Sequence, residues 1–511
     1  MLPAGFRHLT IGSGIRAAAA RRPAKAAIHL DDRTLTYAEL TRRMARVAHV
    51  GRAALELRAG DRVALVAPNC LEYVELVAGL SDIGVIVATL SPALTRGELR
   101  AILDDCTPRA LIVHPDVAEA VDPAWAADMA LLTLGPAYER LLERADDGAS
   151  LPEVAEWEPF ALAYTSGTTG KPKGVLLSHR SRALSFLAMA AEYGCFGEDD
   201  HFLALAPMCH GAGFVFACAA LSFGGTTSLF TQGDPEAMLV RMTAGDVTGV
   251  FMVPTHFNRL FGLPAATLAA HRAHSLKAII SNAAALPQAM KAQAIAQFGD
   301  GILHETYGST EAGIVTNIRP ADQLRKPASV GLPFANMEVM LRDEAGAAVP
   351  PGAVGELYCR GPTIFNGYWN REAATAETLV DGWVTVGDLA VRDGDGFLSI
   401  VDRKKDMIVT GGLNVYPREI EDVIARLPGV REVAVVGLPD DRWGERLHAF
   451  VVTDDRAPVS EADIEELCRR ELAGYKQPKG VSFIPALPRN AGGKILKRAL
   501  RQPPSAEAGD R

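Results

Sequence analysis

The sequence predicts an α/β protein with a large, multi-lobed N-terminal domain of doubly wound sheets and a β-rich lobe, followed by a small, mobile α+β C-terminal domain. Short apolar runs alternate with helix-like segments through residues 1–150, and short strands with turns begin near residue 330. Five consecutive charged residues at 402–406 then precede about 100 residues of mixed pattern. Regular alternation of strand and helix is typical of a parallel sheet with helices on both faces.

The first part of the chain alternates most regularly. Apolar residues at helical spacing predict helices at 15–20, 37–55, 70–82 and 96–105. Short apolar runs predict strands at 62–66, 85–90 and 110–113. Asp31 and Asp32 separate two short runs, 26–30 and 33–37, and this pattern predicts a β-hairpin. The pair Gly12 and Gly14 has the outline of a dinucleotide fingerprint, but it lacks a preceding strand and we attribute it to chance.

The middle of the chain continues the alternation of strands and helices and then changes to short strands separated by turns. We expect a helix at 180–191, a strand at 202–206, and strand–helix units at 250–260 and 278–296. Residues 214–223 are apolar on all sides, which predicts a buried helix. Short strands with turns at 338–341, 355–359 and 393–396 predict the β-rich lobe.

The charged run at 402–406 is read as a hinge, with a solvated turn as the alternative. An α+β pattern follows, with helices at 417–427 and 460–473 and strands at 432–437, 447–453 and 481–484. We therefore place an N-terminal domain at 1–402, the hinge at 403–406 and a C-terminal domain at 407–511.

Composition excludes several classes of protein. A formal net charge of -9 over 511 residues argues against general nucleic-acid binding, which relies on a basic face. Seven cysteines without a Cys-x-x-Cys pair argue against a disulfide framework and a cysteine zinc site. No run of 18 apolar residues lacks charges, so we expect no integral membrane segment. These features fit a cytoplasmic protein.

The stretch Tyr164 to Gly174 is the strongest local signal. It combines glycines, hydroxyl residues and lysines, which together supply backbone N–H groups, hydrogen-bond donors and positive charge for an anion. The residues are Thr165, Ser166, Gly167, Thr168, Thr169, Gly170, Lys171, Lys173 and Gly174. Because Pro172 follows Lys171, the stretch is not a Walker A loop. We interpret it as a phosphate-binding loop, and a polar surface loop is the alternative.

Three further stretches accompany this loop in order along the chain. They are His304-Glu-Thr-Tyr-Gly-Ser-Thr-Glu311, Gly382-Trp-Val-Thr-Val-Gly-Asp388 with Asp402-Arg403, and Pro488-Arg-Asn-Ala-Gly-Gly-Lys494. Together the four stretches resemble the adenylate-forming superfamily of acyl- and aryl-CoA synthetases, luciferases and peptide-synthetase adenylation domains, over about residues 30–500. The resemblance implies that a carboxylate attacks the α-phosphate of ATP and forms an acyl-adenylate and pyrophosphate. A thiol then displaces AMP to give a thioester.

The resemblance also implies roles for single residues toward ATP and Mg²⁺. Thr165 to Lys173 would hold the β- and γ-phosphates, Thr310 would contact the α-phosphate, and Glu311 with Thr165 would bind Mg²⁺, a cation that prefers oxygen ligands. Tyr307 would stack on adenine, while Asp388 would bind the ribose with support from Arg403. The adenine edge would lie along Asn282, Ala283, Ala284 and Ala285.

Lys494 would be the principal catalytic residue in this scheme, because its ammonium could bridge the attacking carboxylate and the α-phosphate. The remaining catalytic assignments are His210, Thr310 and Glu311. Lys405 would be the pivot about which the C-terminal domain rotates between the two steps. At Asp402 the sequence departs from the glycine that many members of the superfamily carry.

The thiol is expected to be coenzyme A. Gly411 and Gly412 resemble the loop that lines the pantetheine tunnel of CoA ligases, and Trp443 or Tyr475 could stack on the CoA adenine. The sequence holds no carrier-protein domain, which favours free CoA. The alternative is a stand-alone adenylating enzyme that loads an acyl group onto a separate carrier protein.

The acid is expected to be largely apolar, either aromatic or aliphatic, because the residues implied around it include no fixed charge. They are His210, Gly211, Gly213, Phe214, Thr255, His256, Phe257, Ser281 and Gly308. His210 would act as an aromatic gate, or else as an ordinary core histidine. A nucleotide-binding or scaffolding protein without turnover is a third possibility. The sequence leaves the oligomeric state open, a homodimer included.

Overall fold

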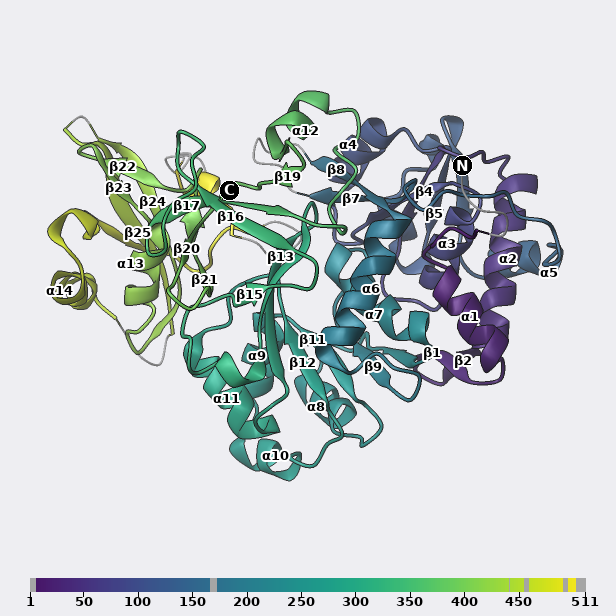
Figure 1. The fold of residues 1–511 in the computed structure, drawn as a ribbon, viewed down its shortest axis with the longest axis horizontal. Helices are drawn as coiled ribbons and strands as arrows, with labels where there is room; N and C mark the ends of the chain where they lie inside the picture. Colours follow the sequence, from purple (N-terminus) through teal and green to yellow (C-terminus); the bar gives the residue numbers. More distant parts are fainter. Residues whose placement is uncertain (1–5, 166–171, 441, 455–458, 490–494, 502–511) are drawn as a thin grey trace, which may run out of the picture. The chain divides into compact units, whose positions relative to one another are not determined.

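The computed structural model describes residues 6–165, 172–440, 442–454, 459–489 and 495–501. The predicted loop residues 166–171 and Lys494 lie outside them. The chain forms two compact units, Met1–Val339 with Tyr358–Val386, and Met340–Leu357 with Gly387–Arg511 (Figure 1). It passes between the units three times, within strands β16 (Glu338–Arg342) and β17 (Val354–Arg360) and between Val386 and Gly387. The predicted hinge at 403–406 lies inside the second unit, and its role as a domain boundary stays a prediction.

The largest sheet belongs to the first unit and has nine strands among the described residues. Their order is β15-β14-β13-β12-β11-β9-β10-β1-β2, and the strands from β13 to β1 in this order run parallel. The bounds are β1 Ala26–Leu30, β2 Arg33–Thr36, β9 His201–Ala204, β10 Thr226–Leu229, β11 Gly249–Met252, β12 Ala278–Ser281, β13 Leu303–Ser309, β14 Gly313–Ile318 and β15 Leu332–Pro333.

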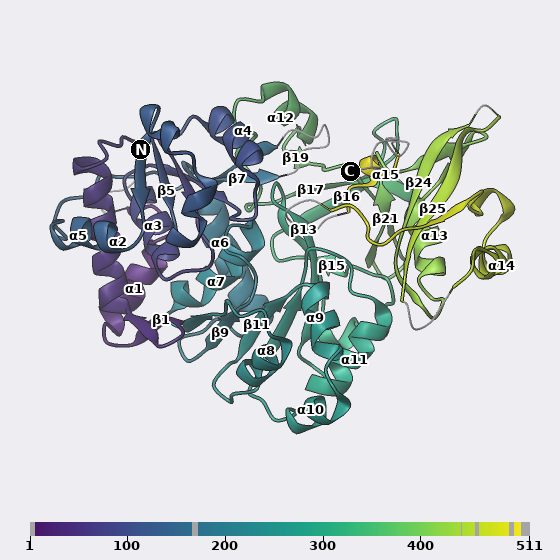
Figure 2. The same ribbon diagram turned by 180° about the vertical axis from the view of Figure 1, so that it is seen from behind.

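Alternating side chains bury both faces of this sheet. Phe202 and Phe251 point toward one side, where the ring of Phe251 stacks on Phe216 of α7 (Gly211–Phe223) with centroids 4.4 Å apart. Leu203 and Val250 point the other way into a core shared with three helices, α8 (Pro235–Met242), α9 (Pro254–Phe261) and α11 (Gln288–Phe298). Figures 1 and 2 show α6 (His179–Tyr193) and α7 on one side of the sheet and α8, α9 and α11 on the other. The sheet is therefore doubly wound, as predicted.

A second sheet of the first unit is built in the same manner. Its order is β6-β5-β3-β4-β7-β8, with only β8 antiparallel among the described pairings. The bounds are β3 Arg62–Val66, β4 Ile86–Leu90, β5 Ala110–Val113, β6 Ala130–Thr133, β7 Pro159–Thr165 and β8 Lys173–Ser178. The associated helices are α1 Ser13–Arg21, α2 Tyr37–Ala53, α3 Glu72–Ser81, α4 Arg96–Cys106 and α5 Pro136–Glu143.

The second unit holds a smaller sheet in the order β23-β22-β25-β24, with β26 (Val481–Phe483) parallel to β25. The other strands are β22 Ile408–Thr410, β23 Leu413–Val415, β24 Val430–Asp440 and β25 Gly444–Thr453. Helices α13 (Pro417–Ile424) and α14 (Glu461–Glu471) bury their apolar residues against one face, with Ile420 and Ile464 fully buried. This is the predicted α+β pattern. The unit also contains the hairpin of β20 (Asp388–Arg392) and β21 (Leu398–Arg403).

Most predicted elements are confirmed within a few residues, including the hairpin at Asp31 and the buried helix α7. Residues 338–341 and 355–359 are strands, whereas 393–396 form the turn between β20 and β21. The elements that the sequence analysis did not predict include β6, α5 and the antiparallel pair β7 and β8, each of eight residues or fewer. The described residues before Gly12, 6–11, contain no strand, which agrees with the interpretation of the fingerprint outline as chance.

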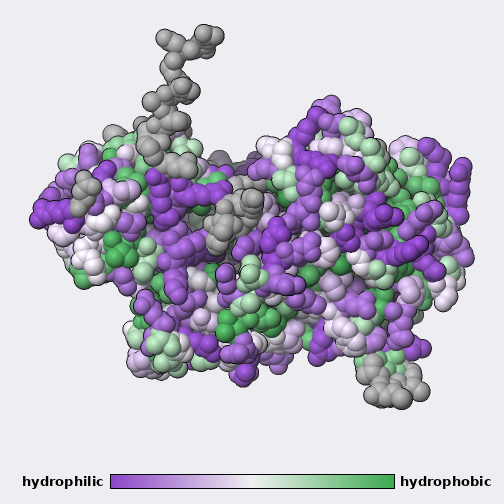
Figure 3. Space-filling view, turned by 90° about the horizontal axis from the view of Figure 1, so that it is seen from above, coloured by the Kyte–Doolittle hydropathy of each residue, from purple (hydrophilic) through white to green (hydrophobic). Residues whose placement is uncertain are grey.

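The surface in Figure 3 shows hydrophobic residues in scattered groups between hydrophilic ones. Every cysteine is buried and reduced. In the part of the chain that the structure describes, no helix combines the length and the apolar character that a membrane crossing requires.

Candidate active site

Several predicted site residues gather at the carboxyl edge of the nine-stranded sheet. Ser281 pairs with Met252 on one side and Glu305 on the other, so β11 and β12 end together and β13 continues past them to Ser309. The predicted adenine residues 282–285 follow β12, and Tyr307 lies in the neighbouring parallel strand β13, two residues beyond the register of Ser281 with Glu305. Crevices beyond the carboxyl ends of such strands are the usual ligand sites of open α/β sheets.

The turn that carries Thr310 and Glu311 joins β13 to β14. Arg182, buried in α6, donates to the Thr310 carbonyl oxygen at 3.1 Å and to the Thr363 carbonyl oxygen at 3.1 Å. Burial lowers the pKa of Arg182 to about 10, so the guanidinium remains charged at neutral pH. The Tyr368 hydroxyl donates to Glu311 Oε1 at 2.9 Å. The turn is thus held through its backbone and its carboxylate.

The predicted phosphate loop is anchored by an antiparallel pair of strands. Thr165 at the end of β7 faces Lys173 at the start of β8. The Lys173 ammonium lies 5.1 Å from the centre of the Tyr368 ring, a cation–π contact. Thr165 and Lys173 therefore stand at the two ends of the undescribed segment, as a hairpin loop requires.

The loop after β12 is fixed to β13 by side chains. Asn282 donates to the Thr306 hydroxyl at 2.6 Å, and the Leu286 N–H donates to Glu305 Oε1 at 2.8 Å. Ala283 adopts φ 76°, a left-handed conformation that costs energy in a residue other than glycine. Strained backbone held by neighbouring hydrogen bonds is common at ligand sites.

The start of α7 carries another part of the predicted acid wall. His210 is the N-cap residue of α7, and desolvation lowers its pKa, which favours the neutral imidazole. A Cβ on Gly211 would lie 4.0 Å from the Thr310 methyl group, so α7 begins beside the Thr310 turn. A Cβ on Gly213 would meet the Pro207 carbonyl oxygen at 2.1 Å, so close backbone packing requires this glycine. Phe214 is buried against Tyr73 and Phe160.

The rest of the predicted acid wall lies on β12, β13 and α9. Phe257 is fully buried in the core below the sheet, and Ser281 is fully buried at the end of β12. Thr255 is exposed, and His256 shares a small cavity with Leu205, Phe230, Met238 and Arg259. At Gly308 a Cβ would meet the Gly313 carbonyl oxygen at 2.0 Å, so hairpin geometry accounts for this glycine. The acid-binding roles of all these residues stay predictions.

In the second unit, Asp388 and Arg403 face each other across β20 and β21 and form an ion pair of 3.1 Å. Asp402 is buried and accepts the Arg418 N–H at 3.0 Å, which caps the first turn of α13. Its carboxylate therefore has a structural task that a glycine at this position could not perform. Desolvation and the nearby Arg403 lower the pKa of Lys405, the predicted pivot.

The predicted CoA residues of the second unit include two exposed aromatic rings, each with its own basic neighbour. Gly411 has φ 58°, its N–H donates to the Trp443 carbonyl oxygen at 2.8 Å, and a Cβ on it would meet the Trp443 ring. Gly412 also has a positive φ of 78°. The rings of Trp443 and Tyr475 are exposed, and Arg442 and Lys476 lie over them.

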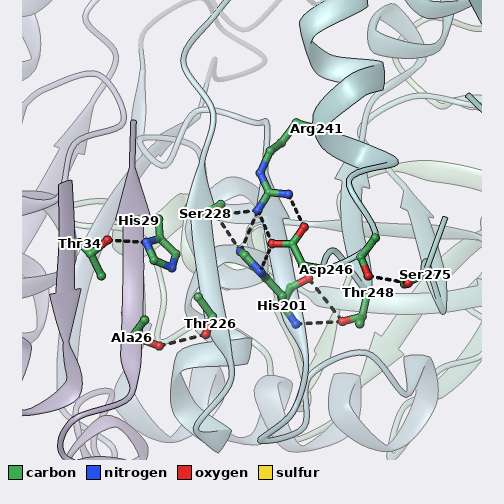
Figure 4. A network of polar contacts seen from close by, with 11 residues as sticks. Ala26, His29, Thr34, His201, Thr226, Ser228, Arg241, Asp246, Thr248 and Ser275 are labelled. Atoms are coloured by element: carbon green, nitrogen blue, oxygen red, sulfur yellow. Dashed lines mark hydrogen bonds and ion pairs between the residues drawn. The ribbon is translucent and has the colours of Figure 1, made fainter. Parts of the chain in front are cut away.

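A separate polar cluster lies on β1, β9 and β10 together with α8 and the loop after it (Figure 4). His201 Nδ1 is 3.0 Å from Asp246, its Nε2 is 2.7 Å from the Ser228 hydroxyl, and Arg241 pairs with Asp246 at 2.6 Å. Burial lowers the pKa of His201 to about 4, so the imidazole is neutral. Because His201 begins β9, this cluster is at the amino end of that strand, away from the carboxyl edge.

The sequence reading missed Arg182 and Tyr368, the two side chains that hold the turn at 310–311. Both lie far from that turn in sequence, and an arginine in a helix or a tyrosine in a loop gives no local sign of such a contact. The only available signal was the pair of glycines at 361 and 367, which marks an irregular segment.

Comparison with known proteins gives two family matches. Residues 15–369 match the model described as AMP-binding enzyme, and residues 419–494 match the model described as AMP-binding enzyme C-terminal domain. Together they span most of the chain in the order that the four sequence stretches predict.

Similar proteins cover nearly the full length. A feruloyl-CoA synthase of Amycolatopsis sp is 38% identical over 504 residues, covering 97% of this chain and 99% of that protein. An indoleacetate–CoA ligase of Aromatoleum aromaticum is 34% identical over 495 residues, covering 94% and 95%. The crystal structure of ATP-bound MatB from Rhodopseudomonas palustris superposes with a TM-score of 0.88 at 32% identity, covering 97% and 98%.

Proposed function

This chain belongs to the AMP-binding enzyme family, and from that premise we propose that it is an AMP-forming ligase that joins a largely apolar carboxylic acid to coenzyme A. The acid is first activated by ATP as an acyl-adenylate with release of pyrophosphate, and CoA then displaces AMP. The observation that carries the proposal is that one tyrosine of the first unit, Tyr368, contacts both Lys173 and Glu311, while Arg182 holds the neighbouring Thr310 carbonyl.

The adenylation step needs positive charge, because the attacking carboxylate and ATP are both anions. Lys173 and the loop before it supply charge and N–H donors for the β- and γ-phosphates. Lys494 supplies the ammonium at the α-phosphate, where charge develops as the bond to pyrophosphate breaks. Tyr307 offers a ring for adenine, and Asp388 offers carboxylate oxygens to the ribose hydroxyls.

The carboxylate of Glu311 fits a magnesium ligand. Only one of its oxygens takes the hydrogen bond from Tyr368, and carboxylate oxygens are hard ligands with several lone-pair sites. Thr165 at the end of β7 adds a hydroxyl near the same loop. When bound, Mg²⁺ would neutralise phosphate charge, while these residues hold the phosphates in place.

The acid is proposed to be aromatic. The two relatives above carry the names of feruloyl and indoleacetate substrates, which both place a ring on a short carboxylic acid chain. Gly211 leaves room beside Thr310 at the start of α7. No carboxylate or ammonium side chain belongs to the predicted acid wall, which favours a ring without a second charge.

Coenzyme A is the proposed thiol. Trp443 and Tyr475 are exposed aromatic rings beside Arg442 and Lys476, and this combination suits an adenine and its phosphates. We keep a carrier protein as the competing acceptor. A homodimer also stays a prediction, which the molar mass in solution tests.

A panel of acids tests the proposal. Pyrophosphate release is measured with ferulate-like and indole-containing acids, with medium and long fatty acids, and with no acid. We expect the aromatic acids to give the highest rates and to yield a CoA thioester with equimolar AMP. Pyrophosphate release with fatty acids alone would overturn the proposal that the acid is aromatic. Thioester formation only on a carrier protein would overturn the proposal that CoA is the acceptor. If no acid stimulates pyrophosphate release, the proposed ligase activity is overturned.

A further inference from the structure

Tyr368 contacts two predicted phosphate-site groups of opposite charge. Its hydroxyl donates to Glu311 Oε1 at 2.9 Å, and the Lys173 ammonium lies 5.1 Å from the centre of its ring. Among the described residues no ion pair joins Lys173 to Glu311. The phenol ring therefore contacts the ammonium with its face and the carboxylate with its polar end.

The backbone around Tyr368 is fixed to both of these neighbours. Tyr368 forms a β-bridge with Val175 of β8, the Leu176 N–H donates to the Gly367 carbonyl oxygen at 3.0 Å, and the Trp369 N–H donates to the Gly174 carbonyl oxygen at 2.8 Å. On the other side, the Phe365 N–H donates to the Glu311 carbonyl oxygen at 2.8 Å. Residues 365–369 thus connect the strand after the phosphate loop with the turn of Glu311.

We propose that Tyr368 is a positioning residue that holds the Glu311 carboxylate and the Lys173 ammonium apart and oriented for Mg·ATP. This inference rests on the proposed function. A hydrogen bond to one oxygen restricts rotation of the carboxylate and leaves the other oxygen for a cation. The ring face offers the ammonium a neutral partner, so that its charge remains available to a phosphate. Without the ring, the two charges could pair with each other and be lost to the substrate.

The two parts of Tyr368 can be separated by substitution. Y368F keeps the ring beside Lys173 and removes the hydroxyl from Glu311. Y368L removes both contacts. Y138F is a matched control, because the Tyr138 hydroxyl also donates to a glutamate, Glu75, at 2.5 Å, but in a buried network of α2, α3 and α5.

The experiment measures ATP binding by calorimetry with Mg²⁺ and with EDTA, together with thermal unfolding. We expect Y368F to weaken Mg·ATP binding roughly tenfold, as loss of a hydrogen bond to a metal ligand typically does. Metal-free ATP binding by Y368F should stay within about twofold, whereas Y368L should weaken both. Y138F should lower the melting temperature and leave both affinities unchanged.

Equal Mg·ATP affinity in Y368F and the wild type would overturn the proposal. So would equal losses in Y368F with Mg²⁺ and with EDTA, because that result indicates a general structural defect. If Y368L does not fold, the comparison of Y368F with the wild type, with Mg²⁺ and with EDTA, still tests the proposal. A wild type that binds Mg·ATP but releases no pyrophosphate with any acid would overturn the proposed function alone. A wild type that binds no Mg·ATP would overturn both.

Discussion

Asp388 on β20 pairs with Arg403 on β21, with Arg403 Nε 3.1 Å from the carboxylate. Asp388 is almost fully buried, whereas the arginine is half-exposed. The carboxylate is thus held in one orientation by a charged partner that lies directly across the hairpin. A fixed carboxylate suits a pair of adjacent ribose hydroxyls.

Asp388→Asn is expected to weaken ATP binding about tenfold, because an amide accepts fewer hydrogen bonds than a carboxylate and charge-assisted bonds are stronger. Arg403→Ala should weaken it as well, since the carboxylate loses its orienting partner. Arg360→Ala is the control, because Arg360 pairs with Glu338 in an exposed position of the first unit. Calorimetric titration with ATP measures the effect, and unchanged affinity in both Asp388→Asn and Arg403→Ala would refute the ribose assignment.

Lys494→Ala is expected to lower acid-dependent pyrophosphate release by about 10²–10³, the usual cost of one preorganised electrostatic contact. The second half-reaction serves as an internal control. When the variant is given the acyl-adenylate and CoA, thioester formation should proceed near the wild-type rate. An unchanged adenylation rate would remove Lys494 from the catalytic role.

Trp443→Ala and Tyr475→Ala are expected to raise the KM for CoA roughly tenfold, as loss of a base-stacking ring does elsewhere. The KM for ATP and for the acid should not change. Trp157→Ala is the control, since Trp157 is a still more exposed ring of the first unit. Steady-state kinetics with varied CoA decide the matter, and an unaltered KM in both variants would place the CoA adenine elsewhere.

Lys291→Met is expected to destabilise the first unit by about 3–5 kcal/mol, because it leaves the Glu305 charge buried without its partner. Lys291 and Glu305 are 2.5 Å apart and nearly inaccessible to water. The double variant with Glu305→Gln should recover part of the loss, since the amide oxygen can still accept the Leu286 N–H. Urea unfolding measures the free energy of unfolding of the single and the double variant. A double variant no more stable than Lys291→Met would refute the explanation that an unpaired buried charge causes the loss.

The pH dependence of stability follows from buried neutral histidines. Burial lowers the pKa of His179 to about 4, and that of His201 also to about 4, from an ordinary value near 6.5. The unfolded chain therefore binds these protons at a higher pH than the folded chain does. Stability is complete above about pH 6.5 and falls as the pH decreases toward 4.

His179→Gln should flatten this decline by about 3 kcal/mol over that range, because glutamine does not titrate and its amide oxygen can still accept the Ile11 N–H. Thermal unfolding at a series of pH values measures the slope. A variant with the same slope as the wild type would show that folding does not lower the pKa of His179.

The local pattern of hydrophobic residues was sufficient to predict most helices and strands. The alternation of short apolar runs and helical segments predicts β3, β5 and α4 closely, because hydrophobic periodicity and caps act within a few residues. Short elements such as β6, with four residues, and α5, with eight, were missed because their patterns extend over too few residues. The sequence does not show why glycine is required at 213 and 308. The neighbours of Gly213 and Gly308 are backbone atoms that only the folded chain brings within contact.

The sequence by itself determined the fold class and the order of four stretches that place the chain in its family, whereas the phosphate-binding role of the loop at 165–173 stays a prediction. These features depend on residue types at fixed spacing, which a linear chain displays directly. Only the tertiary structure decided that Tyr368 stands between Lys173 and Glu311, and that Arg182 holds the Thr310 turn. Such contacts join residues more than 50 positions apart, and their geometry depends on how sheets and connecting segments pack.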